Sequence, residues 1–483
     1  MIEAWQPSVC QLALTILAPI YSELKQAELK AYVMVKSGLG GTIKQYVWHK
    51  FSILSKINCT EIFVISSTLK NKKNKKNLAI ALLKAHGTPE LFEKMKVDGI
   101  LVGDLIYDRY LKTYKKTTLD FNDGKLLQEI LHFLIHFEKW QKIFTKNTIV
   151  GICISEHVYE LALPARIAIS KDIEVLRVFP NSIYRLSKNY MHAETDFDQY
   201  RNIFKSLPKE EQVAGVEEAK TKVLKKFDSE LGFNELGVEQ SPSLGLPNIE
   251  IIKKSKNIKV LVAAHDFYDA PHSYGFSFYP DFHIWLERLG ELSELTSYDW
   301  YLKTHPLVRF KNHEILKDFV SKYPKFILLD SKTRHSDIIN QGIDIVLTVN
   351  GTISSEYPAF GKIAINASLD NPHSAYTFSI TPAHVSEYES LILNLHLAQK
   401  HIVEQEIYEF YFMHKLFPIS SWIFISPNRM RAELGSERAC IITNSFSYFL
   451  TTNNLIPEHM VRSALVKFLN SKDVKLTREH FRI

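Results

Sequence analysis

Short apolar runs alternate with longer segments of helical periodicity along most of this chain. In the first half, the apolar runs are 31–36, 60–65, 98–102, 148–154 and 173–179, and the helical segments include 78–96 and 125–145. Runs this short, bounded by polar turns, are typical of buried parallel strands. Strands that alternate with helices predict a doubly wound α/β sheet.

The alternation stops once and then resumes. Residues 228–257 are rich in Gly, Pro, Ser and charged side chains, which is typical of a domain boundary. Beyond them, strands are predicted at 259–264, 299–303, 325–329, 344–349 and 362–366, with helices at 281–293 and 312–321. With 483 residues, the chain is also too long for one ordinary core.

We therefore predict an α/β fold of two Rossmann-type doubly wound domains that face a cleft, followed by C-terminal helices. The predicted boundaries are 1–230 for the N-terminal domain, 231–257 for the linker, 258–400 for the C-terminal domain and 401–483 for the helical region. The cleft between two such domains is the default place for a ligand. A dinucleotide-dependent dehydrogenase is disfavoured, because no GxGxxG follows any predicted strand.

Charge and cysteine content narrow the class of protein further. The net charge is +6, and Cys10, Cys59, Cys153 and Cys440 lie far apart without metal-ligand spacing, which favours reduced thiols in a cytoplasmic protein. Lysines gather in residues 70–76, either as a solvated segment or as a contact for an anionic membrane surface. No aromatic residues are interleaved with these lysines, so no nucleic-acid partner is expected.

The N-terminal segment also bears on localisation. Glu3 stands where a signal peptide would carry cationic residues, and the apolar part that follows is short. No stretch approaches the ~18–20 apolar residues of a membrane span. We expect a cytoplasmic protein, with peripheral contact at the inner membrane as an option.

Two predicted strands of the second series end in polar clusters. Residues 303–306 (Lys-Thr-His-Pro) follow one strand, and residues 350–356 (Asn-Gly-Thr-Ile-Ser-Ser-Glu) follow the other. Ligands of open α/β sheets lie beyond the carboxyl ends of the strands. Gly and hydroxyl side chains at the start of a predicted helix suit a phosphate, although helix caps also explain part of this pattern. The candidates for donor binding are Lys303, His305, Gly351, Thr352, Ser354, Ser355 and Glu356.

The densest polar cluster, residues 265–275, directly follows the predicted strand 259–264. A carboxylate here could serve as general base or nucleophile, so Asp266 and Asp269 are catalytic candidates, and His265 and His272 are donor-binding candidates. A structural turn capped by an aspartate is a second interpretation. A metal site of His265, Asp269 and His272 is a third, but this spacing matches no familiar ligand set.

Three segments of the N-terminal half carry further candidates. Gly40 and Gly41 lie between a predicted strand and a helix, where they permit close approach of a ligand or form a tight turn. Asp104 follows the predicted strand 98–102, with Asp108 one turn later. Glu156 follows the predicted strand 148–154, where a general base would sit. Caps and surface ion pairs remain open as alternatives for these carboxylates.

Four of these segments together resemble GT-B glycosyltransferases of bacterial capsule and lipopolysaccharide biosynthesis. They are GDLIYDRYLK (103–112), HDFYDAPHSYG (265–275), WYLKTHP (300–306) and NGTISSEYPAFGKIAI (350–365). The His-Pro pair and the Ser/Thr turn are also similar to those of bacterial sialyltransferases and Kdo transferases, which use CMP-linked sugars.

The resemblance implies a nucleotide-sugar donor in the C-terminal domain and a glycan or lipid-linked acceptor in the N-terminal domain. It implies catalytic or acceptor-side roles for Asp104, Asp108 and Glu156, ribose contact for Glu356 and a cleft loop at Gly40 and Gly41. It also implies a metal-independent enzyme without a cofactor, and Kdo or a sialic acid as the preferred sugar. Two alternatives remain: a CDP-alditol phosphotransferase of the teichoic-acid type, and a non-catalytic scaffold of a polysaccharide assembly complex.

Overall fold

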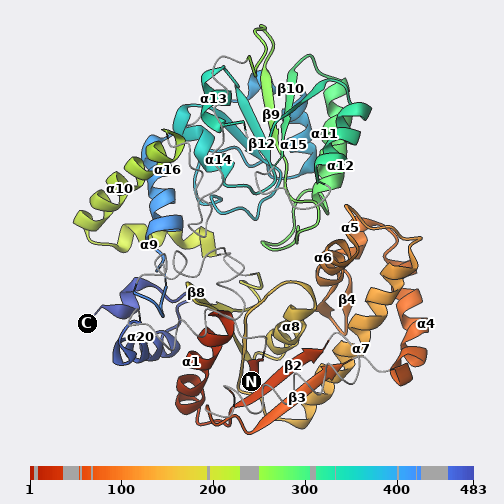
Figure 1. The fold of residues 1–483 in the computed structure, drawn as a ribbon, viewed down its shortest axis with the longest axis vertical. Coiled ribbons are helices and arrows are strands. Elements are labelled where there is room, and N and C mark those ends of the chain that lie inside the picture. The colour runs from red at the N-terminus through yellow and green to blue at the C-terminus, as the bar shows by residue number, and fades with distance from the viewer. Residues whose placement is uncertain are drawn as a thin grey trace. The chain divides into compact units, whose positions relative to one another are not determined.

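Two compact units make up the chain in the computed structural model (Figure 1). Unit 1 comprises Met1–Thr113, Leu119–Ala193 and Pro418–Ile483, and unit 2 comprises Tyr114–Thr118 and Glu194–Phe417. The structure describes residues 1–4, 9–35, 54, 57–66, 69–192, 196–228, 250–304, 312–331, 333–399, 402–419, 421–425 and 455–482.

Unit 1 is built on a six-stranded sheet in the order β3-β2-β1-β6-β7-β8. Its strands are β1 (Ile2–Glu3), β2 (Lys30–Val35), β3 (Glu61–Ser66), β6 (Gly151–Ile154), β7 (Glu174–Phe179) and β8 (Ser182–Leu186). Neighbouring strands are parallel except for β7 and β8, which pair antiparallel. The chain passes from β1 to β2 and β3 on one side and then to β6 on the other. The strand order therefore reverses between β1 and β6, which is where doubly wound sheets bind ligands.

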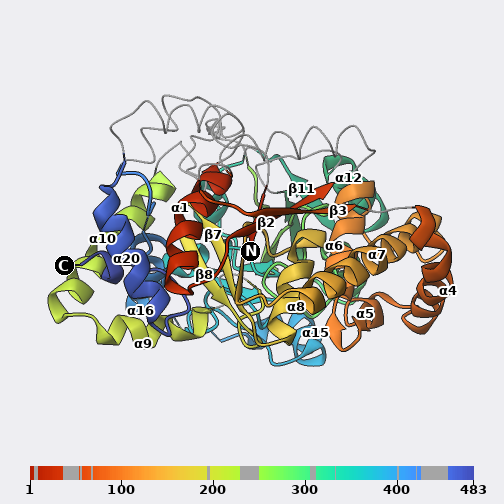
Figure 2. The same ribbon diagram turned by 90° about the horizontal axis from the view of Figure 1, so that it is seen from below.

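Helices cover both faces of this sheet. On one face, α1 (Val9–Leu24) and α20 (Glu458–Asn470) share an apolar core with the strands and lie side by side (Figure 2). On the other face, Trp140 of α7 (Gly124–Lys146) makes an edge contact with Tyr32 of β2, with ring centroids 4.7 Å apart. α8 (Leu163–Ser170) contacts β6 and β7. The C-terminal segment thus completes the core of the N-terminal sheet.

Unit 2 contains a five-stranded, fully parallel sheet in the order β11-β10-β9-β12-β13. Its strands are β9 (Lys259–Ala263), β10 (Asp299–Lys303), β11 (Phe326–Leu329), β12 (Ile345–Thr348) and β13 (Ile363–Asn366). The order repeats that of the first five strands of unit 1, and it reverses between β9 and β12. The carboxyl ends of these two strands define the switch point of unit 2.

Alternate residues of the unit 2 strands face opposite helical layers, as the two-residue period of a strand requires. Val260 and Val262 face α11 (Phe282–Glu294), α12 (Asn312–Lys322) and α15 (Val385–Leu393). Leu261 and Val346 face α13 (His335–Asn340) and α14 (Ile353–Glu356). A third layer, formed by α9 (Tyr200–Ser206), α10 (Lys209–Asp228) and α16 (Glu404–Tyr411), has its own aromatic core.

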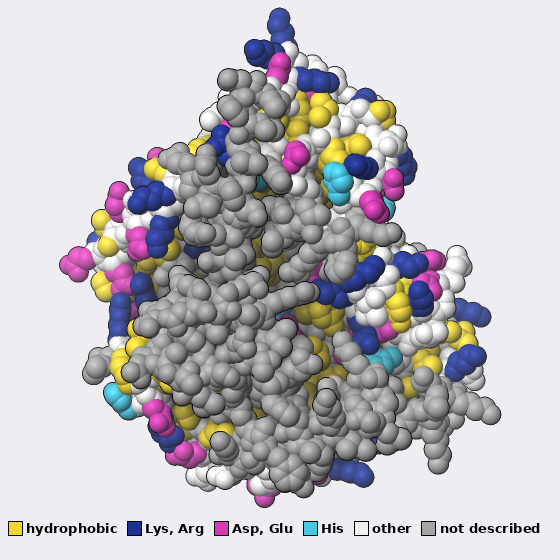
Figure 3. Space-filling model, in the orientation of Figure 1, with side chains coloured by type: hydrophobic (Ala, Val, Ile, Leu, Met, Phe, Trp, Pro, Cys, Tyr) yellow, Lys and Arg dark blue, Asp and Glu magenta, His cyan; other side chains and the backbone are white. Residues whose placement is uncertain are grey.

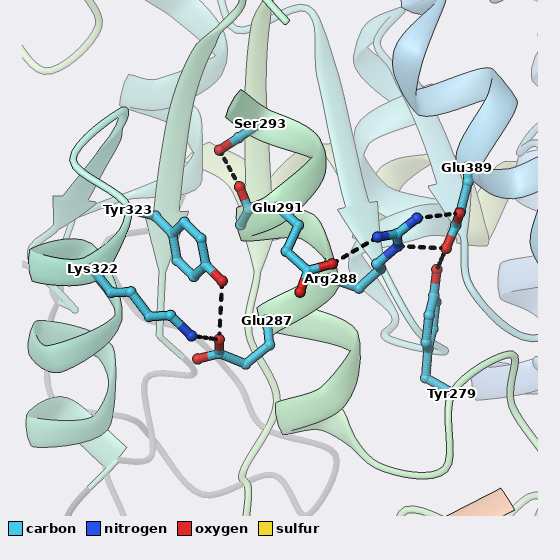
Figure 4. Close-up of polar contacts among 9 residues, drawn as sticks. Tyr279, Glu287, Arg288, Glu291, Ser293, Lys322, Tyr323 and Glu389 are labelled. Atoms are coloured by element: carbon cyan, nitrogen blue, oxygen red, sulfur yellow. Dashed lines mark hydrogen bonds and ion pairs between the residues drawn. The ribbon is translucent and has the colours of Figure 1, made fainter. Parts of the chain in front are cut away.

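Polar pairs tie the first of these layers together (Figure 4). Arg288 of α11 donates to both carboxylate oxygens of Glu389 on α15 at 2.7 Å, and Tyr279 donates to Glu389 at 3.0 Å. Glu287 of α11 accepts from Lys322 of α12 at 2.5 Å and from Tyr323 at 3.1 Å. These contacts are partly exposed, so each contributes little, at most about 1 kcal/mol. They hold α11 against the sheet, and the carboxyl edge of the sheet is lined by loops.

The predicted fold class of two Rossmann-type doubly wound sheets is confirmed. Strand 98–102 is an error: Ile100–Leu101 forms β5, which pairs antiparallel with β4 (Lys96–Val97) in a separate ribbon. The helical prediction 78–96 is also wrong in extent, because α4 (Leu69–Ala85) starts earlier and ends at Ala85, and the short α5 (Pro89–Phe92) follows. Strands β1 and β8 were not predicted.

The division of the chain differs from the predicted one. Unit 2 begins at Glu194, upstream of the predicted linker 231–257, and α9 and α10 therefore belong to it. The predicted helical region 401–483 is shared, because its first part stays with unit 2 and the part from Pro418 packs on unit 1. Residues 231–249 of the linker lie outside the described residues.

Candidate functional site

His265 links the ends of β9 and β12 at the switch point of unit 2. It follows β9, and its Nε2 accepts a hydrogen bond from the backbone N–H of Val349 at 3.2 Å, just after β12. The Thr348 hydroxyl lies 3.0 Å from the same nitrogen and accepts from the N–H of Gly351 at 3.2 Å. Because Nε2 accepts, the ring is a neutral imidazole with its proton on Nδ1. The ring also stacks on Phe282 of α11, with centroids 4.3 Å apart.

The close contact between Thr348 and the turn after β12 requires a glycine at position 351. A Cβ atom at this position would lie 2.7 Å from the Thr348 hydroxyl oxygen and 3.6 Å from the His265 ring. A side chain would therefore push the turn off the end of β12. Donor binding by Gly351 stays a prediction, and the close approach seen in this structure is to the protein itself.

The turn from Gly351 to Glu356 contains only one turn of α-helix, α14, followed by a 3-10 segment at Tyr357–Phe360. Ser354 Oγ donates to the carbonyl of Gly351 at 2.8 Å, and Ser355 Oγ donates to the carbonyl of Thr352 at 2.7 Å. Both hydroxyl protons are directed at the backbone, as is common for serines in helical turns. The predicted helix start after β12 is thus a single helical turn, and the hydroxyls of Ser354 and Ser355 donate to its backbone.

A buried polar network lies behind this turn. His373 Nε2 is 2.7 Å from Ser354 Oγ and 3.2 Å from Asn366 Oδ1, at the carboxyl end of β13. The Asn366 amide nitrogen donates to Ser379 and Thr381 at 3.1 Å each. All of these side chains except Thr381 are buried, and burial lowers the pKa of His373 to about 3. Sequence reasoning missed His373 and Asn366, although both follow a correctly predicted strand.

Lys303, the last residue of β10, is buried, with only 3% of its surface exposed. Its Nζ donates to the carbonyl of Ser331, beyond β11, at 2.9 Å. Burial lowers the pKa of Lys303 to about 8, and the charge of Asp330 partly offsets this effect. Among the described residues, no carboxylate lies within ion-pair distance of Nζ. Lys303 is therefore a buried and not an exposed strand-end lysine.

The loop 265–275 contains both structural and exposed carboxylates. Asp266 Oδ1 accepts from the N–H of Tyr268 and from the side-chain amide of Asn312, both at 3.1 Å, so it caps a turn and anchors the start of α12. Asp269 is exposed, whereas His272 is 3% exposed and contacts the ring of Phe276. Among the described residues, no set of three His, Cys, Asp or Glu side chains is arranged to hold a metal.

The predicted residues of unit 1 lie in different environments. Asp104, at the start of α6 (Gly103–Tyr114), is 1% exposed and accepts from Arg166 at 2.6 Å in a buried ion pair. Asp108 is buried in the same helix, and Glu156 is partly exposed after β6. The predicted residues Gly40, Gly41 and His305 lie outside the described residues.

A carboxylate that sequence reasoning passed over occupies the switch point of unit 1. Glu3 ends β1, and its Oε2 accepts from the backbone N–H of Ser155 at 2.8 Å and from the Ser155 hydroxyl at 2.7 Å, just after β6. Burial raises the pKa of Glu3 to about 7, and the nearby charge of Glu156 adds to this effect. The two-residue strand that carries Glu3 is too short to show a pattern.

Membrane contact through the lysines at 70–76 remains a prediction. Of these lysines, only the side chains of Lys75 and Lys76 are described, and Lys75 pairs with Glu138 at 3.3 Å. On the face shown in Figure 3, Lys and Arg side chains lie among Asp and Glu side chains. No helix in the described part of the chain has the length and apolar character to span a bilayer.

Comparisons with known proteins give only distant structural similarities. No protein-family model and no curated protein matches the sequence. Among solved structures, the chain is similar to Methanocaldococcus jannaschii UDP-GlcNAc 2-epimerase with UDP-GlcNAc and UDP (10% identity, TM-score 0.24, covering 84% of this chain and 96% of the other). It is also similar to Neisseria meningitidis UDP-GlcNAc 2-epimerase bound to UDP-GlcNAc (13%, 0.25, 86% and 93%) and to Anabaena HepE with UDP and glucose (10%, 0.26, 89% and 97%). At these TM-scores the similarity does not define the function, and the fold assignment rests on the strand order of the two sheets.

Proposed function

We propose that the protein is a nucleotide-sugar-dependent glycosyltransferase whose unit 2 holds the phosphates of the donor at the carboxyl edge of its sheet. The observation that carries the proposal is Lys303, a buried cation at the end of β10 whose partner among the described residues is one backbone carbonyl. Buried charges in proteins are as a rule paired, so this ammonium group calls for an anion. A donor phosphate would supply that anion.

The rest of the edge is compatible with an anion. His265 is held as a neutral imidazole, so it brings no negative charge to the switch point. The turn that follows β12 is held close to the strand ends by the Thr348–Gly351 bond. Thr352 and Glu356, both partly exposed in this turn, are the proposed contacts to the nucleotide. His305 and His272 remain proposed donor contacts from the sequence.

The finer assignment follows the motif resemblance. We propose transfer of the sugar to a growing bacterial surface glycan, with a CMP-linked Kdo or sialic acid as the preferred donor and with no metal requirement. Among the carboxylate candidates, Asp104 and Asp266 hold structural partners, which favours positioning roles for them. Asp269 and Glu156, which are exposed or partly exposed, are the better candidates for a general base.

Nucleotide binding by Lys303→Met tests the proposal. Methionine fills the same buried space without the charge and removes the cost of burying an ammonium group, and thermal unfolding of the variant checks that it folds. Losing a hydrogen bond to a charged phosphate costs about 1.5–3 kcal/mol, so the dissociation constant should rise roughly 10- to 150-fold. Calorimetry with CMP, CDP, UMP and UDP would measure the change and rank the nucleotides.

Lys325→Met is a matched control. Lys325 Nζ also donates to backbone carbonyls, those of Ser293, Glu294 and Thr296, but it precedes β11 and so lies at the amino edge of the sheet. Its replacement should leave nucleotide affinity unchanged. Equal affinity of the Lys303 and Lys325 variants would refute the phosphate role, and preference for a CDP-alditol would favour the phosphotransferase alternative.

The pKa of Lys303 adds a pH test. With a pKa of about 8, the side chain loses its charge at mildly alkaline pH, and an anion binds more tightly to the protonated form. Wild-type affinity should therefore fall as the pH rises from 7 to 9, by up to about tenfold per unit above the pKa. The Lys303→Met variant should show a flatter profile over the same range.

A further inference from the structure

We propose that His373 is a positioning residue for donor binding, which fixes the turn Gly351–Glu356 through the hydroxyl of Ser354. This inference rests on the proposed function, because the turn is the proposed nucleotide contact. It assigns a role to a residue that lies outside every motif recognised in the sequence. His373 comes seven residues after the end of β13, in a loop that returns beneath α14.

The direction of each hydrogen bond in the network is set by its partners. Asn366 uses its amide nitrogen as donor to Ser379 and Thr381, so its carbonyl oxygen faces His373. A carbonyl oxygen only accepts, and therefore His373 Nε2 carries the proton. Ser354 Oγ shares this proton with Asn366 Oδ1 in a three-centre bond and donates its own proton to the carbonyl of Gly351.

This chain of hydrogen bonds ends at Gly351, which is also bonded to Thr348 at the switch point. Gly351 is bonded through its N–H to Thr348, on the side of β9 and β12, and through its carbonyl to Ser354, on the side of β13. Two neutral imidazoles thus brace one turn from opposite sides: His265 through Thr348, and His373 through Ser354. A turn braced in this way is preorganised, which lowers the entropic cost of binding a ligand.

The side chains around His373 hold its imidazole ring in place and keep it neutral. Its ring packs against Phe378 and Phe410, with centroids 5.7 and 5.6 Å away, and it is 1% exposed. Burial holds the imidazole neutral at physiological pH. Among the described residues, its Nδ1 has no hydrogen-bond partner, which is unfavourable for a buried polar atom. An apolar side chain would avoid this cost, so a histidine at this position points to the use of Nε2.

Two substitutions separate this role from simple packing. His373→Phe keeps an aromatic ring against Phe378 and Phe410 but has no donor. His373→Gln places an amide N–H near the position of Nε2 but loses the ring. Calorimetry with the nucleotide that binds wild type best, together with thermal unfolding of each variant, gives affinity and stability separately.

We expect His373→Phe to weaken nucleotide binding about tenfold, the effect of losing roughly one hydrogen bond's worth of positioning. His373→Gln should stay within about threefold of wild type, although it loses ring packing and unfolds at a lower temperature. Ser354→Ala should weaken binding as much as His373→Phe, and the double variant no further, because both act through one chain of bonds.

Several outcomes would overturn the inference. Equal affinities of the Phe and Gln variants would mean that the donor is irrelevant, and additive losses in the double variant would mean that Ser354 and His373 act separately. Either result leaves the proposed function standing if wild type binds nucleotide and Lys303→Met does not. Absence of nucleotide binding by wild type would overturn the proposed function and the inference with it.

Discussion

In both units, a side chain at the end of the first strand accepts hydrogen bonds across the switch point, but the accepting groups differ. In unit 1, the side chain at the end of the first strand, Glu3, accepts from the backbone N–H and hydroxyl of Ser155. In unit 2, the side chain after the first strand, His265, accepts from the N–H of Val349 and lies within hydrogen-bond distance of the Thr348 hydroxyl. The acceptor is a carboxylate in one case and an imidazole in the other.

This difference indicates which sheet suits an anion. A carboxylate at a switch point repels a phosphate once it ionises, whereas a neutral imidazole does not. Unit 2 also places the buried Lys303 at the same edge, and unit 1 places Glu156 near Glu3. Two sheets with the same strand order therefore differ in the group that accepts at the switch point, and in the proposed function the donor phosphates belong with unit 2.

The largest expected effect comes from making unit 2 resemble unit 1. His265→Glu would keep an acceptor for Val349 but introduce a negative charge at the proposed phosphate site. At ~5 Å and an effective dielectric constant of about 20, two like charges repel by about 3 kcal/mol, which predicts a loss of roughly 100-fold in nucleotide affinity at pH 8. His265→Gln, which offers a neutral carbonyl acceptor, is the control and should bind within about fivefold of wild type. If the Glu variant bound nucleotide as well as the Gln variant, the charge at the unit 2 switch point would not affect nucleotide binding.

A second prediction concerns the stability of unit 1. The pKa of Glu3 in the folded protein is about 7, against an ordinary value of 4.5, so the folded state binds more protons than the unfolded state between these values. Stability from this group is present below pH 4.5 and is lost as the pH rises through 7. Glu3→Gln removes the penalty of burying a charge, so relative to wild type it should gain stability between pH 4.5 and 8, by at most about 3 kcal/mol.

Denaturant unfolding of both proteins at several pH values measures this difference. Because the comparison is between wild type and variant, contributions from other buried groups such as His136, whose pKa burial lowers to about 3, cancel. Ser155 can still donate to the amide oxygen of glutamine. If the stability difference between the two proteins stayed constant from pH 4.5 to 8, Glu3 would titrate normally.

The sequence predicted the sheets better than the sites, for physical reasons. Each unit 2 strand is a buried apolar run between polar turns, and all five were located to within a residue or two of their ends. β1 has only two residues, so Glu3 was considered only as evidence against a signal peptide. The polar clusters singled out in the unit 2 sequence follow the first, second and fourth strands, whereas Asn366 ends the fifth strand and His373 lies in the loop after it.

Hydrogen-bond partners are the part of the candidate site that the sequence does not reveal. Asp104 and Asp266 were chosen for their position after strands, but position does not show whether a carboxylate has a buried partner. Arg166 lies 62 residues from Asp104, and Asn312 lies 46 residues from Asp266. No local pattern links such pairs. The position of Lys303 at a strand end follows from the sequence, whereas its burial depends on β11 and the chain beyond it.

The smallest predicted effect is a paired deletion of the two hydroxyls that serve the switch points. Thr348→Val removes the hydroxyl between His265 and Gly351, which are neutral groups, and should cost about 0.5–1.5 kcal/mol of stability at any pH from 5 to 8. Ser155→Ala removes a donor to Glu3, whose charge changes over the same range. Bonds to charged groups contribute more, about 1.5–3 kcal/mol, so the cost of Ser155→Ala should grow from pH 5 to pH 8 as Glu3 ionises. Denaturant unfolding at both pH values distinguishes a flat from a rising cost. A rising cost for Thr348→Val, or a flat one for Ser155→Ala, would show that the two switch points do not differ in the charge of their acceptors.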